Sequence, residues 1–115
     1  MKGSEKQIVW AQSIIDGLLA YNNKRLADDL ARYNDEVAEC GQASANGTAR
    51  LELRKTVHAL LTAELPKLDD AGWIIDHQGD ILIKVVEQNA QALVPHKAYI
   101  QSHFRGMMDL HRWIA

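Results

Sequence analysis

SEKQIVWA, residues 4–11, is the stretch that decides the fold, because it carries an unusually complete set of signals for the start of an α-helix. Ser4 can accept a hydrogen bond from a free backbone N–H of the first turn. Gln7, three residues later, can accept one in return from the backbone of Ser4. Glu5 places a negative charge at the positive end of the helix dipole. The sequence therefore predicts a helix that begins at residue 5.

Behind this start, apolar or small residues recur in steps of three and four along the chain. They are Ile8, Ala11, Ile15, Leu18, Leu26, Leu30, Tyr33, Val37 and Cys40. Asn22 fills the remaining gap at the same helical phase. This period predicts a single helix over residues 5–40, about 50 Å long at 1.5 Å per residue. A break near Asn22-Asn23 is the alternative.

The rest of the chain also has the spacing of helices. The small, polar stretch at residues 41–47 predicts a loop, and Thr48 is expected to cap a second helix over residues 49–64. Val94-Pro95 marks a break, after which a last helix is expected over residues 96–114.

Residues 73–86 admit two interpretations. Two apolar, β-branched runs flank a turn-like centre, which favours a β-hairpin. Helical spacing continues instead through the second run and beyond it, which favours a helix over residues 80–93 capped by Asp80. Because a two-stranded hairpin would find no third strand in this chain, the helix is preferred.

The expected fold is therefore all-α, a small bundle of four to five helices with a long N-terminal helix. A length of 115 residues suits a single domain over residues 1–115. An α+β fold with a hairpin at about residues 73–86 is the alternative.

Composition narrows the functional classes. With 13 basic and 15 acidic residues the formal net charge is −2, and neither half of the chain is polybasic, so binding of nucleic acid by charge alone is disfavoured. The single cysteine, Cys40, cannot form an internal disulfide. No apolar run reaches the ~18–20 residues that span a bilayer, and the charged N-terminus lacks the apolar core of a signal peptide. A cytoplasmic protein without membrane contact is expected.

The chain carries no recognisable catalytic, cofactor or metal motif. Its five histidines and the aspartates of residues 69–80 lack the spacing of a metal site, and no phosphate-binding glycine loop is present. We therefore expect no enzyme activity, no cofactor and no metal. Trp10, Trp73 and Cys40 are interpreted as core residues.

Basic side chains on two helices are the candidate partner-binding residues. They are Arg50, Arg54, Lys55, His58, Arg105 and Arg112. The first four cluster at helical spacing on the second helix, and the last two belong to a polar stripe on the last helix. Such side chains can contact phosphate groups or the carboxylates of an acidic protein surface.

Two segments together resemble a group of small proteins and domains of bacterial plasmids, prophages and phages. The opening Gly3-Ser4-Glu5-Lys6-Gln7-Ile8-x-Trp10-Ala11 resembles the start of those proteins. The middle Ala71-Gly72-Trp73-Ile74-Ile75-Asp76-His77 is similar to their Ala-x-x-Trp-Ile-Asp-Asn-Arg segment, with His77-Gln78 in place of the Asn-Arg pair. The resemblance implies a mobile-element origin and brings no activity with it.

Small size, near-neutral charge and this resemblance favour a non-enzymatic interaction module that binds a host or phage protein. Its most specific form is an inhibitor of a host defence system, such as an anti-CRISPR protein. The alternative is a nucleic-acid-binding accessory protein of a mobile element, with weak affinity. A homodimer is compatible with either function.

Overall fold

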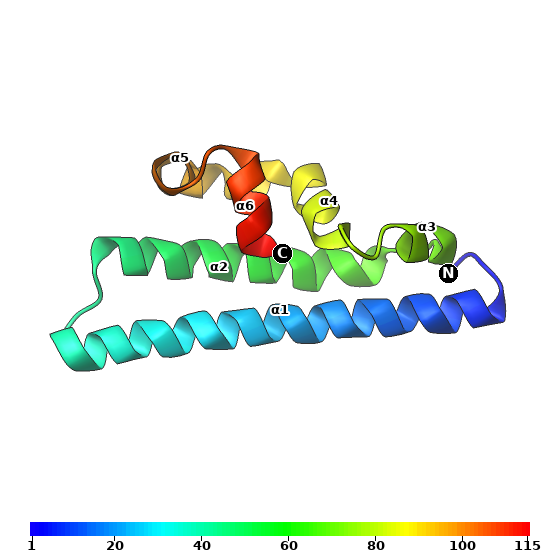
Figure 1. The fold of residues 1–115 in the computed structure, drawn as a ribbon, viewed down its shortest axis with the longest axis horizontal. Helices are drawn as coiled ribbons and strands as arrows, with labels where there is room; N and C mark the ends of the chain where they lie inside the picture. The colour runs from blue at the N-terminus through cyan, green and yellow to red at the C-terminus, as the bar shows by residue number, and fades with distance from the viewer.

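The computed structural model describes residues 1–115, apart from the side chain of Met107, and its fold is all-α (Figure 1). The helices are α1 (Glu5–Cys40), α2 (Ala45–Glu64), α3 (Ala71–Asp76), α4 (Ile81–Gln88), α5 (Lys97–His103) and α6 (Met107–Ile114), with short 3₁₀ segments η1 (Leu65–Lys67) and η2 (Ala90–His96). The all-α prediction and the long N-terminal helix are confirmed.

Helix α1 starts where the sequence predicts and runs without a break. The backbone N–H of Gln7 donates to Oγ of Ser4 at 3.2 Å, and the N–H of Ser4 donates to Oε1 of Gln7 at 3.0 Å, which completes the capping box. Asn22 is only 2% exposed. Its Nδ2 donates to the carbonyl oxygen of His58 at 3.1 Å. This polar residue therefore lies on the buried face of α1 with the apolar residues, and α2 supplies a hydrogen-bond partner for its side chain.

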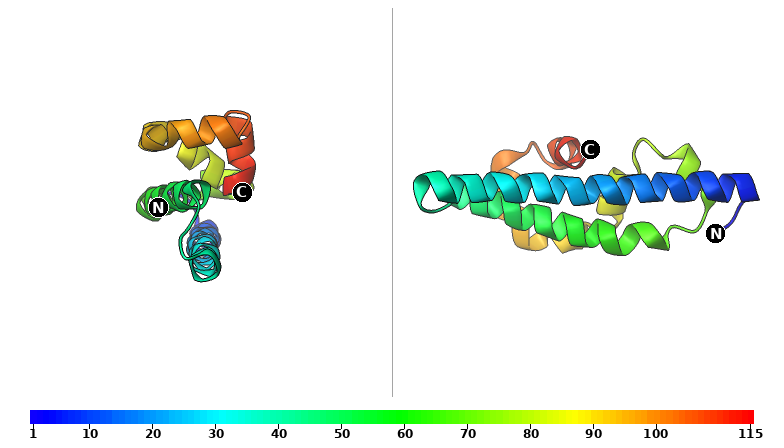
Figure 2. Two further views of the ribbon diagram at one scale, coloured as in Figure 1. Left: turned by 90° about the vertical axis from the view of Figure 1, so that its left-hand side faces the viewer. Right: turned by 90° about the horizontal axis from the view of Figure 1, so that it is seen from below.

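Helix α2 is the middle layer of the molecule. It returns antiparallel to α1, and α4 and α5 lie on its other side, whereas α3 packs against α1 (Figures 1 and 2). The molecule is elongated, at 54 × 27 × 19 Å, because α1 extends along its whole length. The buried core draws on both sides of α2 and consists of Ala11, Ile15, Leu53, Val57, Leu61, Leu65, Ala71, Ile74, Ile81, Leu82, Val85, Val86, Leu93, Leu110 and Ile114.

The hairpin alternative for residues 73–86 is wrong, because this segment forms α3 and α4. Asp70 caps α3 by accepting a hydrogen bond from the N–H of Trp73 at 3.2 Å. Lys2 pairs with the chain just before α3, donating to the carbonyl of Asp69 at 2.6 Å and accepting from the N–H of Ala71 at 2.8 Å. Four of the β-branched residues that resemble a strand are buried within these two short helices, and they are Ile74, Ile81, Val85 and Val86.

The bounds of three other helices differ from the predicted ones, giving six helices rather than four to five. Helix α2 begins four residues early, because Ser44 rather than Thr48 accepts a capping hydrogen bond, from the N–H of Gly47 at 3.0 Å. Helix α4 ends at Gln88, where Asn89 donates its side-chain amide to the carbonyl of Val85 at 2.9 Å.

The predicted last helix is interrupted between α5 and α6. Phe104 is extended, and Gly106 has φ of +72°, a left-handed conformation that only glycine adopts without strain. Asp109 then accepts a hydrogen bond from the N–H of Arg105 at 2.7 Å. The interruption turns α6 back towards α1 and α2 (Figure 1).

Side chains of α1 hold the end of α6. Tyr21 donates its hydroxyl hydrogen to the backbone oxygen of Ala115 at 2.7 Å, and Nη2 of Arg25 donates to that of Trp113 at 2.7 Å. Carbonyl groups at a helix C-terminus carry partial negative charge, so a guanidinium is well placed there.

Two residues expected in the core are at the surface. Trp10 is 52% exposed, because it lies on the flank of α1 that neither α2 nor α3 covers, and Cys40 is exposed at the end of α1. Trp73 is half-buried against the core and stacks on His77, with ring centroids 4.4 Å apart. No helix of the described residues has the length and apolar character needed to cross a membrane.

Candidate binding site

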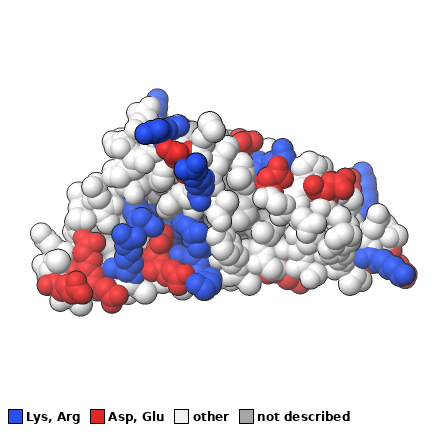
Figure 3. Space-filling view, in the orientation of Figure 1, with Lys and Arg blue, Asp and Glu red and all other residues white. Residues whose placement is uncertain are grey.

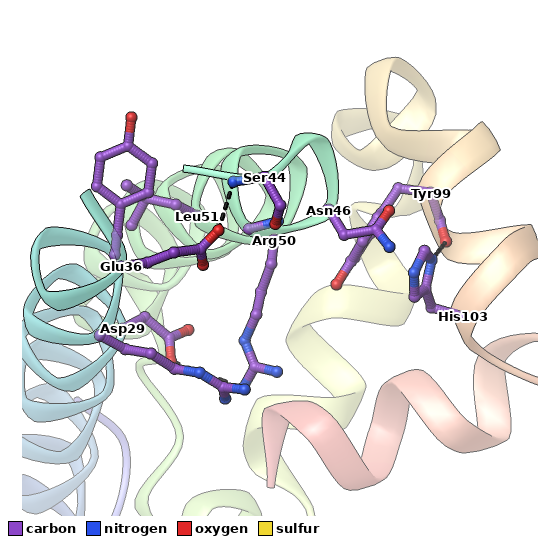
Figure 4. A pocket seen from close by; sticks show the side chains of 11 residues that line it. Asp29, Glu36, Ser44, Asn46, Arg50, Leu51, Tyr99 and His103 are labelled. Atoms are coloured by element: carbon purple, nitrogen blue, oxygen red, sulfur yellow. Dashed lines mark hydrogen bonds and ion pairs between the residues drawn. The ribbon is translucent and has the colours of Figure 1, made fainter. Parts of the chain in front are cut away.

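A cleft of about 250 Å³ lies at the end of the molecule where α1 turns into α2, and α5 forms its far wall (Figure 4). The C-terminal half of α1 supplies one side, and the first two turns of α2 supply the floor. In Figure 4 the side chain of Arg50 extends from α2 past Asp29, and Tyr99 enters from α5. The cleft therefore collects polar groups from three separate helices.

Three charged groups meet at the inner end of the cleft. Nε of Arg54 donates to Oδ2 of Asp29 at 2.8 Å, whereas Nη2 of Arg50 lies 3.8 Å from Oδ1 of the same carboxylate. Asp29 is therefore committed mainly to Arg54. Nε of Arg50 is buried and has no hydrogen-bond partner among the described residues.

The outer end of the cleft contains a second carboxylate, on Glu36. It accepts a hydrogen bond from the backbone N–H of Ser44, at the N-terminus of α2 (Figure 4). This N–H is the main cause that holds the pKa of Glu36 below its ordinary value of 4.5, and the Ser44 hydroxyl and Arg32 lower it further. The Glu36 carboxylate thus connects the end of α1 to the start of α2 through this hydrogen bond, and the lowered pKa favours its charged form.

The wall from α5 is aromatic. The rings of Tyr99 and His103 stack with centroids 4.2 Å apart and planes 25° apart. Nδ1 of His103 lies 3.0 Å from the carbonyl oxygen of Tyr99, so Nδ1 carries the hydrogen of this bond and Nε2 is left unengaged among the described residues. In Figure 4 the Tyr99 phenol points towards Arg50, with the Asn46 amide beside it.

Only Arg50 of the six predicted partner-binding residues lines this cleft. Arg54 is 1% exposed, so its expected place on a partner surface is wrong: it lies inside, with Cζ 3.6 Å from the ring centroid of Trp113. Burial lowers the pKa of its guanidinium, and the carboxylate of Asp29 acts in the opposite direction.

The other four predicted residues are spread over the surface. Lys55 is exposed, with Nζ 3.7 Å from Oε1 of Glu52, and Nε2 of His58 lies 2.8 Å from Oδ1 of Asn23. Arg105 and Arg112 are exposed near and on α6. The six residues therefore do not form one patch.

Several cleft residues were not predicted from the sequence. They are Asp29, Arg32, Tyr33, Glu36, Ser44, Asn46, Gly47, Leu51, Tyr99 and His103. Spacings of three and four residues are the local signal, since they place Asp29, Arg32 and Tyr33 on one face of α1 and Tyr99 and His103 on one face of α5. Their approach to α1 depends on how α5 packs, which no local pattern reveals.

No group of three or more His, Cys, Asp or Glu side chains in the described part of the chain is arranged to hold a metal ion. Comparisons of the chain with protein-family models, with curated proteins and with solved structures found no match. The chemistry of the cleft is therefore the guide to function.

Proposed function

We propose that this protein is a non-enzymatic interaction module that binds a partner protein through the cleft between α1, α2 and α5. One observation carries the proposal: Arg50 lies in the cleft with its Nε buried and unpartnered, and with Nη2 3.8 Å from the nearest carboxylate oxygen. Arginine and tyrosine are the residues most often found at the energetic centre of protein interfaces, and Tyr33 and Tyr99 line the same cleft.

The charges of the cleft favour an acidic segment of the partner. Lys, Arg, Asp and Glu side chains gather over one half of the α1–α2 face, and the part over the N-terminal half of α1 is largely uncharged (Figure 3). Within the charged half, Asp29 is engaged by Arg54 and Glu36 by Ser44. The cationic groups of Arg32 and Arg50 are therefore the ones available to a partner.

The mobile-element resemblance supports a more specific form of this proposal. A phage or plasmid protein of this size that binds a host protein would act as an inhibitor of a host defence system, with the anti-CRISPR proteins as the model. The partner would then be a host or phage protein in the bacterial cytoplasm.

A pull-down from bacterial lysate treated with nuclease tests the proposal. We expect Arg50→Glu to abolish capture of the partner, because it replaces the available cation with an anion in the cleft. Lys55→Glu is the matched control, since Lys55 is exposed on the same helix and does not line the cleft. Capture that Arg50→Glu leaves unchanged would contradict the proposal.

A nucleic-acid-binding accessory protein is the alternative, since Arg32 and Arg50 could also contact phosphates. Asp29 and Glu36 in the same cleft oppose a polyanion, so any such binding would be weak and sensitive to salt. A DNA titration at about physiological salt distinguishes the two. Sub-micromolar, sequence-selective binding without a protein partner would establish the alternative.

Self-association through α1 is a further arrangement that one observation favours. Val9 and Trp10 are adjacent and 70% and 52% exposed. Analytical ultracentrifugation should show a dimer that Trp10→Ala dissociates. A monomer at all concentrations would exclude it.

A further inference from the structure

We propose that the cleft is a site for one anionic group, a carboxylate or a phosphate ester, with the guanidinium of Arg50 as its principal contact. This inference rests on the proposed function in one respect, that the anion is carried by a side chain of the partner. It adds the chemistry of the group that is recognised.

The first argument is the unused donor capacity of Arg50. A guanidinium has five N–H donors in a planar fork that matches the two oxygens of a carboxylate or phosphate. The Nε of Arg50 is buried without a partner, and its Nη2 is too far from Asp29 for a hydrogen bond. The Arg50 side chain is 33% exposed, so an anion in the cleft would first contact its η nitrogens, and a small rotation of the side chain would then bring the buried Nε into the same contact.

The second argument is the crowding of positive charge around Arg54, next to the inner end of the cleft. Asp29 is shared by Arg50 and Arg54, and Arg25 is close enough to Arg54 to repel its charge. Burial is the main cause that lowers the pKa of Arg54, and the positive charges of Arg25 and Arg50 lower it further. A bound anion would relieve this repulsion, which is less screened in a cleft than in open water.

The third argument is the shape and lining of the cleft. A volume of about 250 Å³ is below the usual range of ~300–1,000 Å³ for pockets that hold whole small molecules, and suits a single side chain. The stacked rings of Tyr99 and His103 offer a flat wall opposite Arg50, and the Tyr99 phenol points towards it (Figure 4). A flat ring that bears the anion would contact the wall and Arg50 together.

Benzoate and phenyl phosphate are suitable probes, because each places one of the two anions on a flat ring. NMR spectra of the full ¹⁵N-labelled chain, including the arginine Nε–H signals, would follow each titration, with benzyl alcohol as the neutral control. For fragments of this size we expect saturable binding with Kd on the order of 1 mM. The shifts should centre on the Nε–H of Arg50 and on Tyr99 and His103.

Variants test the assignment to Arg50. Arg50→Gln should weaken binding by about tenfold or more, because it removes the charge and the fork of donors. Arg50→Lys keeps the charge but loses the fork, so it should weaken binding as well, and it serves if Arg50→Gln does not fold. Arg112→Gln, at an exposed arginine outside the cleft, should leave binding unchanged.

The outcomes separate this inference from the proposed function. Tighter binding of either probe supports the site and identifies its anion. The inference is overturned if neither probe gives a saturable shift at about 20 mM, or if no Arg50 variant weakens binding of the probes. This holds even if Arg50→Glu abolishes capture of the partner. Saturable binding at Arg50, together with partner capture that is independent of Arg50, would support the anion site and contradict the proposed function.

Discussion

Arg54 and Asp29 form a buried ion pair that joins α2 to α1, with Nε of the arginine 2.8 Å from Oδ2 of the aspartate. The guanidinium also lies on the indole ring of Trp113, so it contacts all three layers of the fold. A charge enclosed in this way is stable only while its partner remains.

Removing the aspartate should therefore destabilise the protein severely. We expect Asp29→Ala to lower the free energy of unfolding by ~3–5 kcal/mol, because it leaves a buried guanidinium without its counter-charge. Urea denaturation followed by circular dichroism measures the change.

The neighbouring residue supplies a matched control. Asp28 pairs with Lys24 at 2.7 Å, but both side chains are well exposed, so Asp28→Ala should cost about 0.5 kcal/mol or less. The double change Asp29→Leu/Arg54→Met should be less harmful than Asp29→Ala, since no buried charge is left unpaired. Equal losses for Asp28→Ala and Asp29→Ala would show that the pair is not enclosed.

Two glycines inside helices should respond differently to alanine. A Cβ at Gly17 would meet nothing within 4 Å, so Gly17→Ala should stabilise the protein by ~0.5–1 kcal/mol through helix propensity. A Cβ at Gly47 would lie 2.8 Å from Oε2 of Glu36, so Gly47→Ala must shift that carboxylate, whose Oε1 accepts from Ser44, and should stabilise the protein less than Gly17→Ala. Thermal unfolding of both variants measures the difference, and equal stabilisation would contradict the role given to Glu36.

Glu36 should contribute to the pH dependence of stability. Because hydrogen bonds from Ser44 lower its pKa in the folded state, its contribution is present above the ordinary value of 4.5 and is lost as pH falls through the lower folded value. Glu36→Gln removes the titrating group, so the variant should lose less stability than the parent across this acidic window. Urea denaturation at pH values from about 3 to 7 measures it. If the free energy of unfolding of Glu36→Gln depended on pH as steeply as that of the parent, the lowered pKa of Glu36 would be contradicted.

The exposed position of Trp10 predicts a small effect on stability. Trp10→Ala should cost much less than the ~3–5 kcal/mol expected for a fully buried aromatic ring, whereas Trp73→Ala, at a half-buried ring packed on the core, should cost more. Acrylamide quenching of fluorescence offers a second measurement, since Trp10→Phe should remove the most accessible component. A large loss of stability in Trp10→Ala would instead show that the Trp10 ring is part of the core.

Features set by neighbours along the chain could be predicted from the sequence. The capping box of Ser4 and Gln7 and the phase of Asn22 are contained within one helix, and both are observed. Features that depend on which helices meet could not be predicted in this way. The burial of Arg54 requires Asp29, which is 25 residues away, and the cleft forms only when Tyr99 approaches the α1–α2 turn.

The periodicity of residues 96–114 also concealed a break. The apolar spacing continues through Gly106, but its left-handed backbone allows the chain to turn. A spacing of 3.6 residues indicates which side chains are buried. Two short helices that pack on the same core can show one continuous spacing of this kind, so the spacing does not exclude a break between them. Trp10 is a different case. A large aromatic residue on a helix need not face the helices that cover it, so residue type alone did not predict its exposure.

The hydrogen bonds from Tyr21 and Arg25 to the end of α6 connect residues 94 and 88 positions apart. On the ribosome, which adds about 5–20 residues per second, α1 is exposed for several seconds before these acceptors exist. The hairpin of α1 and α2 needs only nearby residues and can assemble in that interval. The later helices would then close over Arg25 and Arg54, so we expect the layers of the molecule to be added in the order of synthesis.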